Sequence, residues 1–333
     1  MPPKPVIIDH DGGHDDLVAL AVLLGNPEAV RVIGCIVTDA DCFVDQAFNV
    51  SGKLMAMVHA SGGTDLFPVA KTSFKGVNPF PSEWRWSAKN MDDLPCANVP
   101  EHLAIWNAVR DQNDALVGEE VMAQLVMSSP EKVTICVTGP LSCVAWCIER
   151  YGEEFCKNVE ECIIMGGAVD VTGNVFIDNR TDGTAEWNIF WDPTAAKTVF
   201  TCPHLKKIIF SLDSTNSVPV TSEVVQKFGA QNKYLLSQFV GSAWASCTHF
   251  ELMRPGDSYY AWDVLTAAYA IDRRLADVEA VSLEVVMDAN APNEGQTRRA
   301  ADGAPFSNTY IAKNTKADMF YQMVMNSVRC CCP

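Results

Sequence analysis

The sequence has no long hydrophobic run, no basic leader and no cysteines at the spacing of a zinc site. The absence of an uncharged apolar stretch of about eighteen residues excludes a conventional membrane-spanning helix. The N-terminus has neither the basic nor the apolar segment of a secretion signal, so we expect an intracellular, cytoplasmic protein. None of the 13 cysteines forms a Cys-x-x-Cys pair, which argues against a zinc site. We expect reduced thiols that pack mainly in the core.

Basic residues are also scarce. The chain has 25 Lys and Arg residues against 41 Asp and Glu residues, a formal net charge of −16. Such a chain repels phosphate backbones and anionic lipid surfaces. We therefore expect no nucleic-acid or membrane partner, and a neutral small molecule or a cation instead.

Several segments of the chain repeat one pattern: a short apolar run, a turn of Gly, Asp, Thr or Pro, and then a helix-length segment. The runs "PVIID", "VRVIGCIV", "KVTICV", "VEECIIM" and "LKKIIF" are the expected strands. This alternation predicts α/β architecture, with a mixed, mainly parallel central sheet flanked by helices. Because α/β folds often reach this length as one domain, we expect a single domain over residues 1–333.

Two irregular segments depart from this pattern, and further elements follow towards the C-terminus. Residues 73–100 are rich in Pro, Asn and Trp and predict a long functional loop, and residues 245–262 predict a second irregular, aromatic stretch. Residues 282–314 resemble a pair of strands, and "ADMFYQMVMNSVR" resembles a closing helix.

The first expected strand runs into a crowded acidic turn, "DHDGGHDD" at residues 9–16. A helix N-terminus stabilises a nearby carboxylate by only about 0.3–1 kcal/mol, which is too little for four clustered charges. A hard cation held by oxygen ligands, Ca²⁺ or Mg²⁺, would stabilise them. The alternative is a solvated acidic turn that caps the helix and binds no metal. Gly12 and Gly13 favour a ligand, because glycine lets the backbone approach it closely.

The acidic turn resembles the Asp-x-Asp-x-Gly-x-Asp-Asp signature of the calcium-dependent nucleoside hydrolases. Further similar segments are "TDADCFV", "VNPFPSEWRWSAKNMDD", "VTICVTGPLS", "IIMGGAVDVTGNVF", "TDGTAEWNIFWDP" and "YYAWDVLTAAY". Trp262 before Asp263 resembles the purine-specific, inosine–adenosine–guanosine branch of protozoan parasites, whereas the inosine–uridine branch has His there. The resemblance implies the Rossmann-like nucleoside hydrolase fold, purine nucleoside substrates, a role in purine salvage and a homodimer.

The resemblance also implies roles for individual residues. Asp11, Asp16, Asp263 and the carbonyl of Thr138 would hold Ca²⁺, and Asp11 would also act as general base. The residues that would hold the ribose are Asp15, Asn174, Glu186 and Asn188, with Trp187 beside them. The implied reaction is attack of a calcium-oriented water on the anomeric carbon, through an oxocarbenium-like transition state.

A second group of residues would act on the base. Trp84 and Trp262 would stack on its two faces, and Asp41 would lie near its edge. Indole stacking favours the base as it becomes protonated, and so assists its departure. His249 and Arg254 match a loop that covers the site in relatives, although a structural role for His249 is equally compatible with the sequence.

Two positions depart from the resemblance and leave alternatives open. Gly13 and His14 stand where close purine-specific relatives carry Asn and Leu, which allows a calcium-dependent nucleoside-binding protein without turnover. We read His10 and His14 as neighbours of the calcium shell. A second enzyme reading is a haloacid-dehalogenase-type phosphatase, with Asp9 as nucleophile and Mg²⁺ as cofactor. The net negative charge of the chain disfavours the anionic substrate of such a phosphatase.

Overall fold

The computed structural model describes residues 2–247 and 258–330, and its centre is an eight-stranded sheet. Seven neighbouring strands run parallel, and the last pairs antiparallel with its neighbour. In spatial order the strands are β3 (Val69–Lys71), β2 (Val30–Val37), β1 (Lys4–His10), β4 (Val133–Val137), β5 (Val159–Met165), β6 (Lys207–Phe210), β12 (Thr309–Lys313) and β9 (Asp277–Ala280). The predicted mixed, mainly parallel sheet of a single α/β domain is confirmed.

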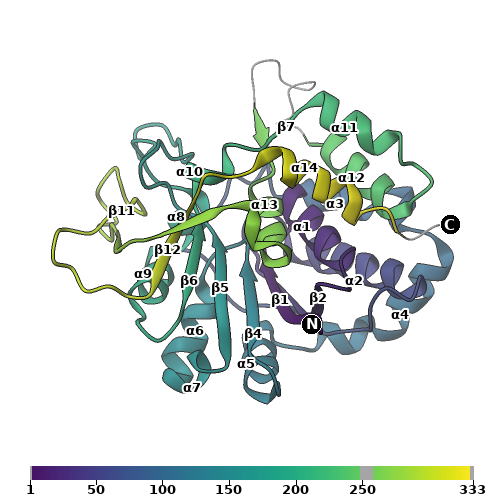
Figure 1. The fold of residues 1–333 in the computed structure, drawn as a ribbon, viewed down its shortest axis with the longest axis horizontal. Coiled ribbons are helices and arrows are strands. Elements are labelled where there is room, and N and C mark those ends of the chain that lie inside the picture. Colours follow the sequence, from purple (N-terminus) through teal and green to yellow (C-terminus); the bar gives the residue numbers. More distant parts are fainter. Residues whose placement is uncertain (1, 248–257, 331–333) are drawn as a thin grey trace.

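Helices cover both faces of this sheet (Figure 1). One face carries α1 (His14–Leu24), α2 (Val44–Ala60), α4 (Pro100–Asp114), α11 (Ser222–Gly229), α12 (Leu235–Ala245), α13 (Trp262–Ile271) and α14 (Ala317–Ser327). The other carries α5 (Gly118–Ser128), α6 (Ser142–Tyr151), α7 (Glu153–Cys156) and α9 (Pro193–Thr201). Shorter helices are α3 (Ser87–Asp92), α8 (Trp187–Trp191), α10 (Leu212–Thr215) and the 3₁₀ turns η1 (Pro95–Ala97) and η2 (Arg273–Leu275).

Strand β1 shows why its sequence fits the centre of the sheet. Its β-branched residues suit the pleated backbone, and successive side chains point to opposite faces. Val6 and Ile8 pack with α1 and α2, whereas Ile7 packs in the core on the α5 and α6 side. All three are at most 1% exposed, so the apolar run spans a strand that is buried on both faces.

Three predictions about local structure need correction. Residues 73–100 form no single long loop, because α3 and η1 lie within them. The strands expected in residues 282–314 do not pair with each other: β10 (Leu283–Val285) pairs with β11 (Thr297–Arg299), while β12 joins the main sheet. The irregular stretch at 245–262 includes β8 (Tyr259–Tyr260), which pairs with β7 (Pro219–Val220). The sequence pattern located β10 and β12 but not their partners.

The cysteine prediction is confirmed for the described residues. Ten of the eleven free cysteines there are buried, and Cys330 is partly exposed. Within the described ranges, no helix has both the length and the apolar character needed to cross a membrane.

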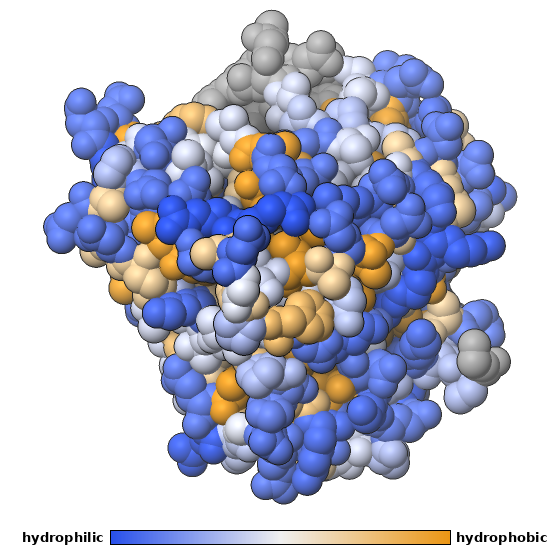
Figure 2. Space-filling model, turned by 60° about the vertical axis from the view of Figure 1, so that its left-hand side comes forward, coloured by the Kyte–Doolittle hydropathy of each residue, from blue (hydrophilic) through white to orange (hydrophobic). Residues whose placement is uncertain are grey.

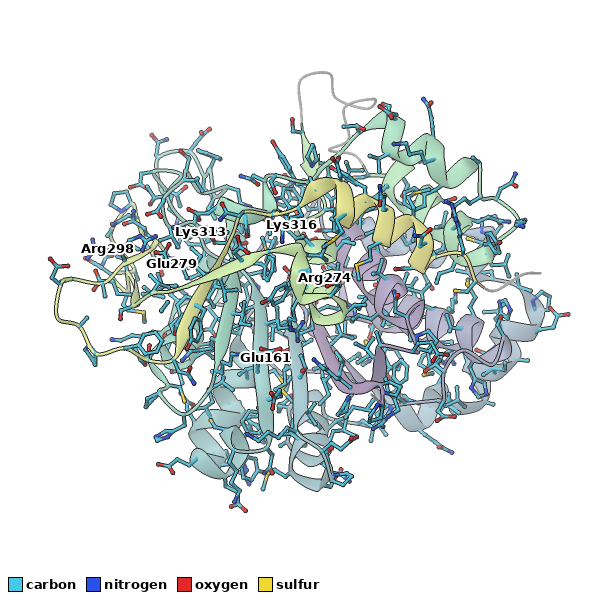
Figure 3. The ribbon with its side chains drawn as sticks, in the orientation of Figure 1. Glu161, Arg274, Glu279, Arg298, Lys313 and Lys316 are labelled. Atoms are coloured by element: carbon cyan, nitrogen blue, oxygen red, sulfur yellow. The ribbon has the colours of Figure 1, made fainter. Side chains whose placement is uncertain are left out.

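The edge of the sheet at β9 and β12 carries exposed charged side chains. Figure 2 shows one face as largely hydrophilic, with small separate apolar areas. Figure 3 shows Glu279, Arg298 and Lys313 on the side of the molecule where β9, β11 and β12 lie. Lys313 contacts Glu279 at 2.7 Å. Water screens exposed pairs of this kind, so they contribute little to the stability of the sheet edge.

Candidate active site

The carboxyl ends of the parallel strands surround a pocket of about 610 Å³, a size typical of small-molecule sites. Twelve of the fourteen residues singled out from the sequence line it: Asp11, Asp15, Asp16, Asp41, Trp84, Thr138, Asn174, Glu186, Trp187, Asn188, Trp262 and Asp263. The other two, His249 and Arg254, lie outside the described residues. Segments separated by up to about 250 positions in the chain thus meet at one pocket.

The two glycines of the acidic turn allow close packing. Gly12 has φ +89°, and a Cβ there would lie 2.3 Å from the Cβ of Ala47. A Cβ on Gly13 would lie 2.6 Å from an oxygen of Asp41 and 3.0 Å from one of Asp16. The backbone N–H of Gly13 donates to Asp16 at 2.8 Å. A larger residue at position 13 therefore requires the carboxylates of Asp41 and Asp16 to move. The arrangement of these carboxylates in this chain thus depends on a glycine at that position.

Asp15 and Asp16 occupy the first turn of α1 and are held by different partners. Asp16 accepts from the hydroxyl of Thr138 at 2.5 Å. Asp15 accepts from the hydroxyl of Tyr259 at 2.7 Å and from the backbone N–H of Asp263 at 3.1 Å. The turn after β1 is thereby joined to the turn after β4 and to the start of α13.

Asp11 and Asp41 lie next to each other in the same pocket. The backbone N–H of Asp41 donates to Asp11 Oδ2 at 3.1 Å. Burial, followed by the charges of Asp16 and Asp41, raises the pKa of Asp11 well above its usual range. Burial and then the charge of Asp15 raise the pKa of Asp16 to about 7. The pKa of Asp41 rises to about 8 by burial and by the charges of Asp16 and Asp15. Each carboxylate thus makes ionisation of the others harder.

A second wall of the pocket is built around the N-terminus of α8. Glu186 caps this helix and accepts from the backbone N–H groups of Asn188 at 2.9 Å and Gly167 at 2.9 Å. The side-chain amide of Asn188 donates to the carbonyl of Thr138 at 2.8 Å. Asn174 accepts from the backbone N–H of Trp187 at 3.1 Å. These bonds fix several polar side chains in one orientation at the pocket wall.

The aromatic lining comes from two separate segments. Trp84, from the chain between β3 and α3, lies edge-on to Trp187 with ring centroids 5.4 Å apart. Trp187 stacks on Phe80 at 4.8 Å. Trp262, at the start of α13, lies edge-on to Tyr259 at 4.9 Å. Such flat apolar surfaces suit a planar ring.

Two further tryptophans near these segments, Trp86 and Trp191, lie outside the pocket. Trp191 is 2% exposed and belongs to the core. Trp86 is 54% exposed and packs against Phe43, with ring centroids 4.7 Å apart. Neither lines the pocket.

The two histidines of the acidic turn have different surroundings. His14 lines the pocket, with Nε2 3.4 Å from the hydroxyl of Ser246. His10 does not line it, because its ring points toward α2 and lies 3.1 Å from the hydroxyl of Ser51. Burial lowers the pKa of His10 to about 3. His10, interpreted from the sequence as a neighbour of the calcium shell, thus directs its ring away from the pocket, whereas Asp11, the next residue, lines it.

The pocket residues carry the oxygen ligands that a hard cation prefers. Among the described residues, they are not, however, grouped into a formed cation site. Six carboxylates line the pocket, and no Lys or Arg is among the described lining residues. Buried carboxylates that crowd together without a basic partner favour binding of a cation. Within residues 2–247 and 258–330, however, no three His, Cys, Asp or Glu side chains are grouped so that they could hold one metal ion. Asp15 and Asp16 are instead hydrogen-bonded to their neighbours.

The phosphatase alternative does not fit the pocket. Its nucleophile, Asp9, is fully buried and is not among the lining residues. Burial raises the pKa of Asp9 well above its usual range, which opposes the charged form that a nucleophile needs. The absence of a basic side chain among the described lining residues also disfavours a phosphate ester.

Comparison with known proteins identifies the family. Residues 6–322 match the family model described as inosine-uridine preferring nucleoside hydrolase. The chain belongs to this family. The family is generally dependent on Ca²⁺, and membership supports hydrolysis of the N-glycosidic bond of ribonucleosides.

Individual relatives differ in the base that they are named for. The chain is 30% identical over 238 residues to a probable uridine nucleosidase 2 of Arabidopsis thaliana, covering 71% of this chain and 67% of the relative. It is 28% identical over 232 residues to the pyrimidine-specific ribonucleoside hydrolase RihA of Shewanella sp. strain MR-4, covering 68% of this chain and 64% of that relative. The matched region thus spans about two thirds of these relatives.

Solved structures agree over nearly the whole chain. An inosine-uridine preferring nucleoside hydrolase from Bacillus anthracis has a TM-score of 0.82 and 30% identity, covering 98% of this chain and 99% of the other. A purine-preferring ribonucleoside hydrolase from Gardnerella vaginalis shares the fold, with a TM-score of 0.74, 19% identity and 98% coverage of both chains. The purine-specific protozoan branch expected from the sequence is not confirmed by these similarities.

Several lining residues were not singled out from the sequence: Phe80, Ser87, Met165, Gly173, Phe176, Leu212, Asn216, Cys247, Ser258, Tyr259 and Tyr260. Asn216 follows the short helix α10 after β6. The rule that sites lie beyond strand ends could have drawn attention to it. Tyr259 and Tyr260 stand immediately before the Ala-Trp-Asp segment, so their position in the sequence was the available signal.

The raised carboxyl pKa values predict how pH affects the calcium-stripped protein. An unfolded Asp loses its proton near pH 3.9, whereas folded Asp16 and Asp41 have pKa values of about 7 and about 8. Between about pH 4 and pH 8 the unfolded chain binds fewer protons than the folded chain, so the free energy of unfolding should fall as pH rises. Denaturant unfolding in chelator at pH 5 and pH 8 measures this slope.

Two variants distinguish the effect of the pocket carboxylates on this slope from the effect of the overall negative charge. Asp41→Asn should flatten the slope, because it removes one of the raised groups. Asp302→Asn changes the net charge equally at an exposed position and should leave the slope unchanged. Equal slopes in all three proteins would contradict the assignment to the pocket.

Proposed function

We propose that this chain hydrolyses the N-glycosidic bond of purine ribonucleosides to free base and ribose. The observation that carries the proposal is a single pocket that joins a carboxylate cluster, a hydrogen-bonded polar wall and two tryptophans from separate segments. These surfaces match the three parts of the reaction: an attacking water, a sugar and a flat leaving group. A role in purine salvage follows from the products.

Asp11, Asp16, Asp263 and the carbonyl of Thr138 would hold Ca²⁺ in this proposal. When bound, Ca²⁺ supplies positive charge that orients a water and the ribose hydroxyls and lowers the pKa of that water. The carbonyl of Thr138 already accepts from Asn188 at 2.8 Å, and a carbonyl oxygen has a second lone pair. The donor set consists of oxygen atoms alone, as a hard cation prefers.

Asp11 is the proposed general base. Its Oδ2 accepts from the backbone N–H of Asp41, which holds the carboxylate in one orientation. Asp11 takes a proton from the water as the water's oxygen attacks the anomeric carbon and the bond to the base breaks. Direct attack through an oxocarbenium-like transition state inverts that carbon and needs no covalent intermediate.

The polar wall would hold the sugar. Asp15, Asn174, Glu186 and Asn188 are the proposed ribose-binding residues, with Trp187 packed beside them. Each of the four is hydrogen-bonded to a neighbouring part of the chain, so little conformational freedom is lost on binding.

The aromatic wall would assist the leaving base. Trp84 and Trp262 are proposed to stack on the purine, and Asp41 to lie near its edge. Stacking on an electron-rich indole favours a ring that gains positive charge, so it stabilises the base as it takes up a proton. The larger purine gains more from such stacking than a pyrimidine does.

The first test is hydrolysis of inosine, adenosine, guanosine and uridine, before and after calcium stripping. We expect release of purine bases that disappears on stripping and returns with Ca²⁺, and a kcat/KM for uridine at least about tenfold lower than for inosine. Chromatography of the released bases measures both. Equal cleavage of uridine would retain the hydrolase and reject the purine assignment.

Asp11→Ala tests the general base. Proton removal by a positioned side chain accelerates a reaction roughly 10²–10⁴-fold. The kcat for inosine should therefore fall by a factor of at least about 10². Calorimetric affinity for inosine should change far less than kcat. Asp302→Ala is the matched control at an exposed position. An active Asp11→Ala enzyme would contradict the assignment, and a wild-type protein that binds inosine without cleaving it would indicate a nucleoside-binding protein instead.

We also propose a homodimer in the cytoplasm. Val77 and Trp86 are 69% and 54% exposed on the segment after β3, and exposed apolar side chains of this size favour a contact. We expect light scattering on a gel-filtration peak to give twice the chain mass of 36.4 kDa. A monomeric mass would reject the dimer and leave the enzymatic proposal unaffected.

A further inference from the structure

Asn216 is a pocket residue to which the proposed reaction gives no role. It follows α10 at the end of the segment that leaves β6, and it lines the pocket together with Trp262. The indole Nε1–H of Trp262 donates to Oδ1 of Asn216 at 3.0 Å. This bond joins two segments that are 46 positions apart in the chain.

The chemistry of the indole determines how the Asn216 amide is oriented. An indole N–H can only donate, so the oxygen of the amide must face it. The side-chain NH₂ group cannot replace that oxygen, because it is a donor as well. The bond therefore requires an acceptor at position 216.

Asn216 is itself attached to the rigid part of the fold. Its backbone N–H donates to the carbonyl of Leu212 at 3.2 Å, closing the last turn of α10. Asp213, in the same helix, accepts from the backbone N–H groups of Val169 at 2.9 Å and Asp170 at 2.8 Å. The position of the Asn216 acceptor is thus tied to the turn that follows β5.

The other contacts of Trp262 are apolar and constrain the ring less. The indole packs partly against Met165, Ala168 and Leu212 and lies edge-on to Tyr259. Aliphatic contacts have no preferred direction about the side-chain torsion, whereas a hydrogen bond to one ring atom has. The rings of Tyr259 and Tyr260, with centroids 4.9 Å and 5.5 Å away, favour certain tilts of the indole but engage no single ring atom. Among the described residues, the bond to Asn216 is the hydrogen bond that restrains the plane of this indole.

We propose that Asn216 is a positioning residue that holds the plane of Trp262 for stacking and so sets the preference for purine over pyrimidine bases. The inference rests on the proposed function, in which Trp262 stacks on the base. A tilted indole loses overlap with both rings of a purine but loses less with the single ring of a pyrimidine. Loss of the bond should therefore lower purine turnover more than pyrimidine turnover.

Two substitutions separate the acceptor from the rest of the side chain. Asn216→Leu keeps a similar volume and removes the acceptor, and Asn216→Asp keeps an acceptor oxygen for the indole. We expect Asn216→Leu to lower kcat/KM for inosine by roughly three- to tenfold, with less than about a twofold change for uridine. Asn216→Asp should restore inosine turnover to within about threefold of the parent.

Ser217→Ala is the matched structural control. Ser217 is the exposed neighbour, and its hydroxyl donates to the carbonyl of Ser214 at 2.6 Å. Its removal loosens the end of α10 without removing a pocket residue, so stability is expected to fall slightly while the ratio of inosine to uridine turnover stays constant. A change in that ratio equal to that of Asn216→Leu would overturn the inference.

A second readout tests the bond without any activity. The indole N–H resonance of Trp262, assigned with Trp262→Phe in a ¹⁵N-labelled protein, should shift upfield in Asn216→Leu and return toward its original position in Asn216→Asp. An unchanged resonance in Asn216→Leu, or an equal loss of inosine and uridine turnover, would overturn the inference. Equal cleavage of inosine and uridine by the parent enzyme, with the resonance shift intact, would instead reject the purine assignment and retain the indole bond.

Discussion

Crowding of buried carboxylates at the carboxyl ends of the sheet is the constraint on which the site depends. Asp11, Asp15, Asp16 and Asp263 are each at most 6% exposed, and burial raises the pKa of each. Isolated charges in such surroundings are strongly unfavourable. The cluster persists in the fold because protons or a cation can neutralise it and because fixed N–H and O–H donors surround it.

Those donors explain why particular residue types occur around the cluster. Gly13 contributes a backbone N–H to Asp16, and Thr138 contributes a hydroxyl to the same carboxylate. The first turn of α13 contributes the N–H of Asp263 to Asp15. The starts of α1 and α13 both lie at the pocket, and helix N-termini favour negative charge. Parallel strands that end at one edge bring these groups together although they are far apart in sequence.

The parts of the structure that depend on local patterns were predictable. Buried strands such as "PVIID" and the acidic helix start at Asp15 and Asp16 were identified from short apolar runs and turn residues. Pairing over long distances was not, which is why β10 and β12 were expected in one hairpin and lie in different sheets. A periodic pattern indicates which face of a strand is buried. The strand with which it pairs, however, depends on the packing of the whole chain.

The same distinction applies within the pocket. Residues with a charge or a large ring, such as Asp263 or Trp262, were predictable from the family resemblance. The sequence did not indicate the direction of the His10 ring, which lies beside Ser51 of α2, because a one-residue step along β1 reverses the direction of the side chain. Asn216 was missed because its hydrogen-bond partner lies 46 positions away in the chain, and its place after β6 was the one local signal that pointed to the pocket.

The pocket combines two requirements that differ in how strictly they constrain the chain. The carboxylate cluster needs several oxygen atoms within one small volume, and a displaced member leaves the remaining charges unbalanced. The base-binding wall needs only flat apolar surfaces, which different aromatic residues supply from different segments. Substitutions in the base-binding wall therefore disturb the site less than substitutions in the carboxylate cluster. A new base preference can arise from them while the cluster stays unchanged. Relatives named for uridine or pyrimidine nucleosides can accordingly belong to one family with this chain, and in the proposed mechanism the residues that orient Trp84 and Trp262 would set its base preference.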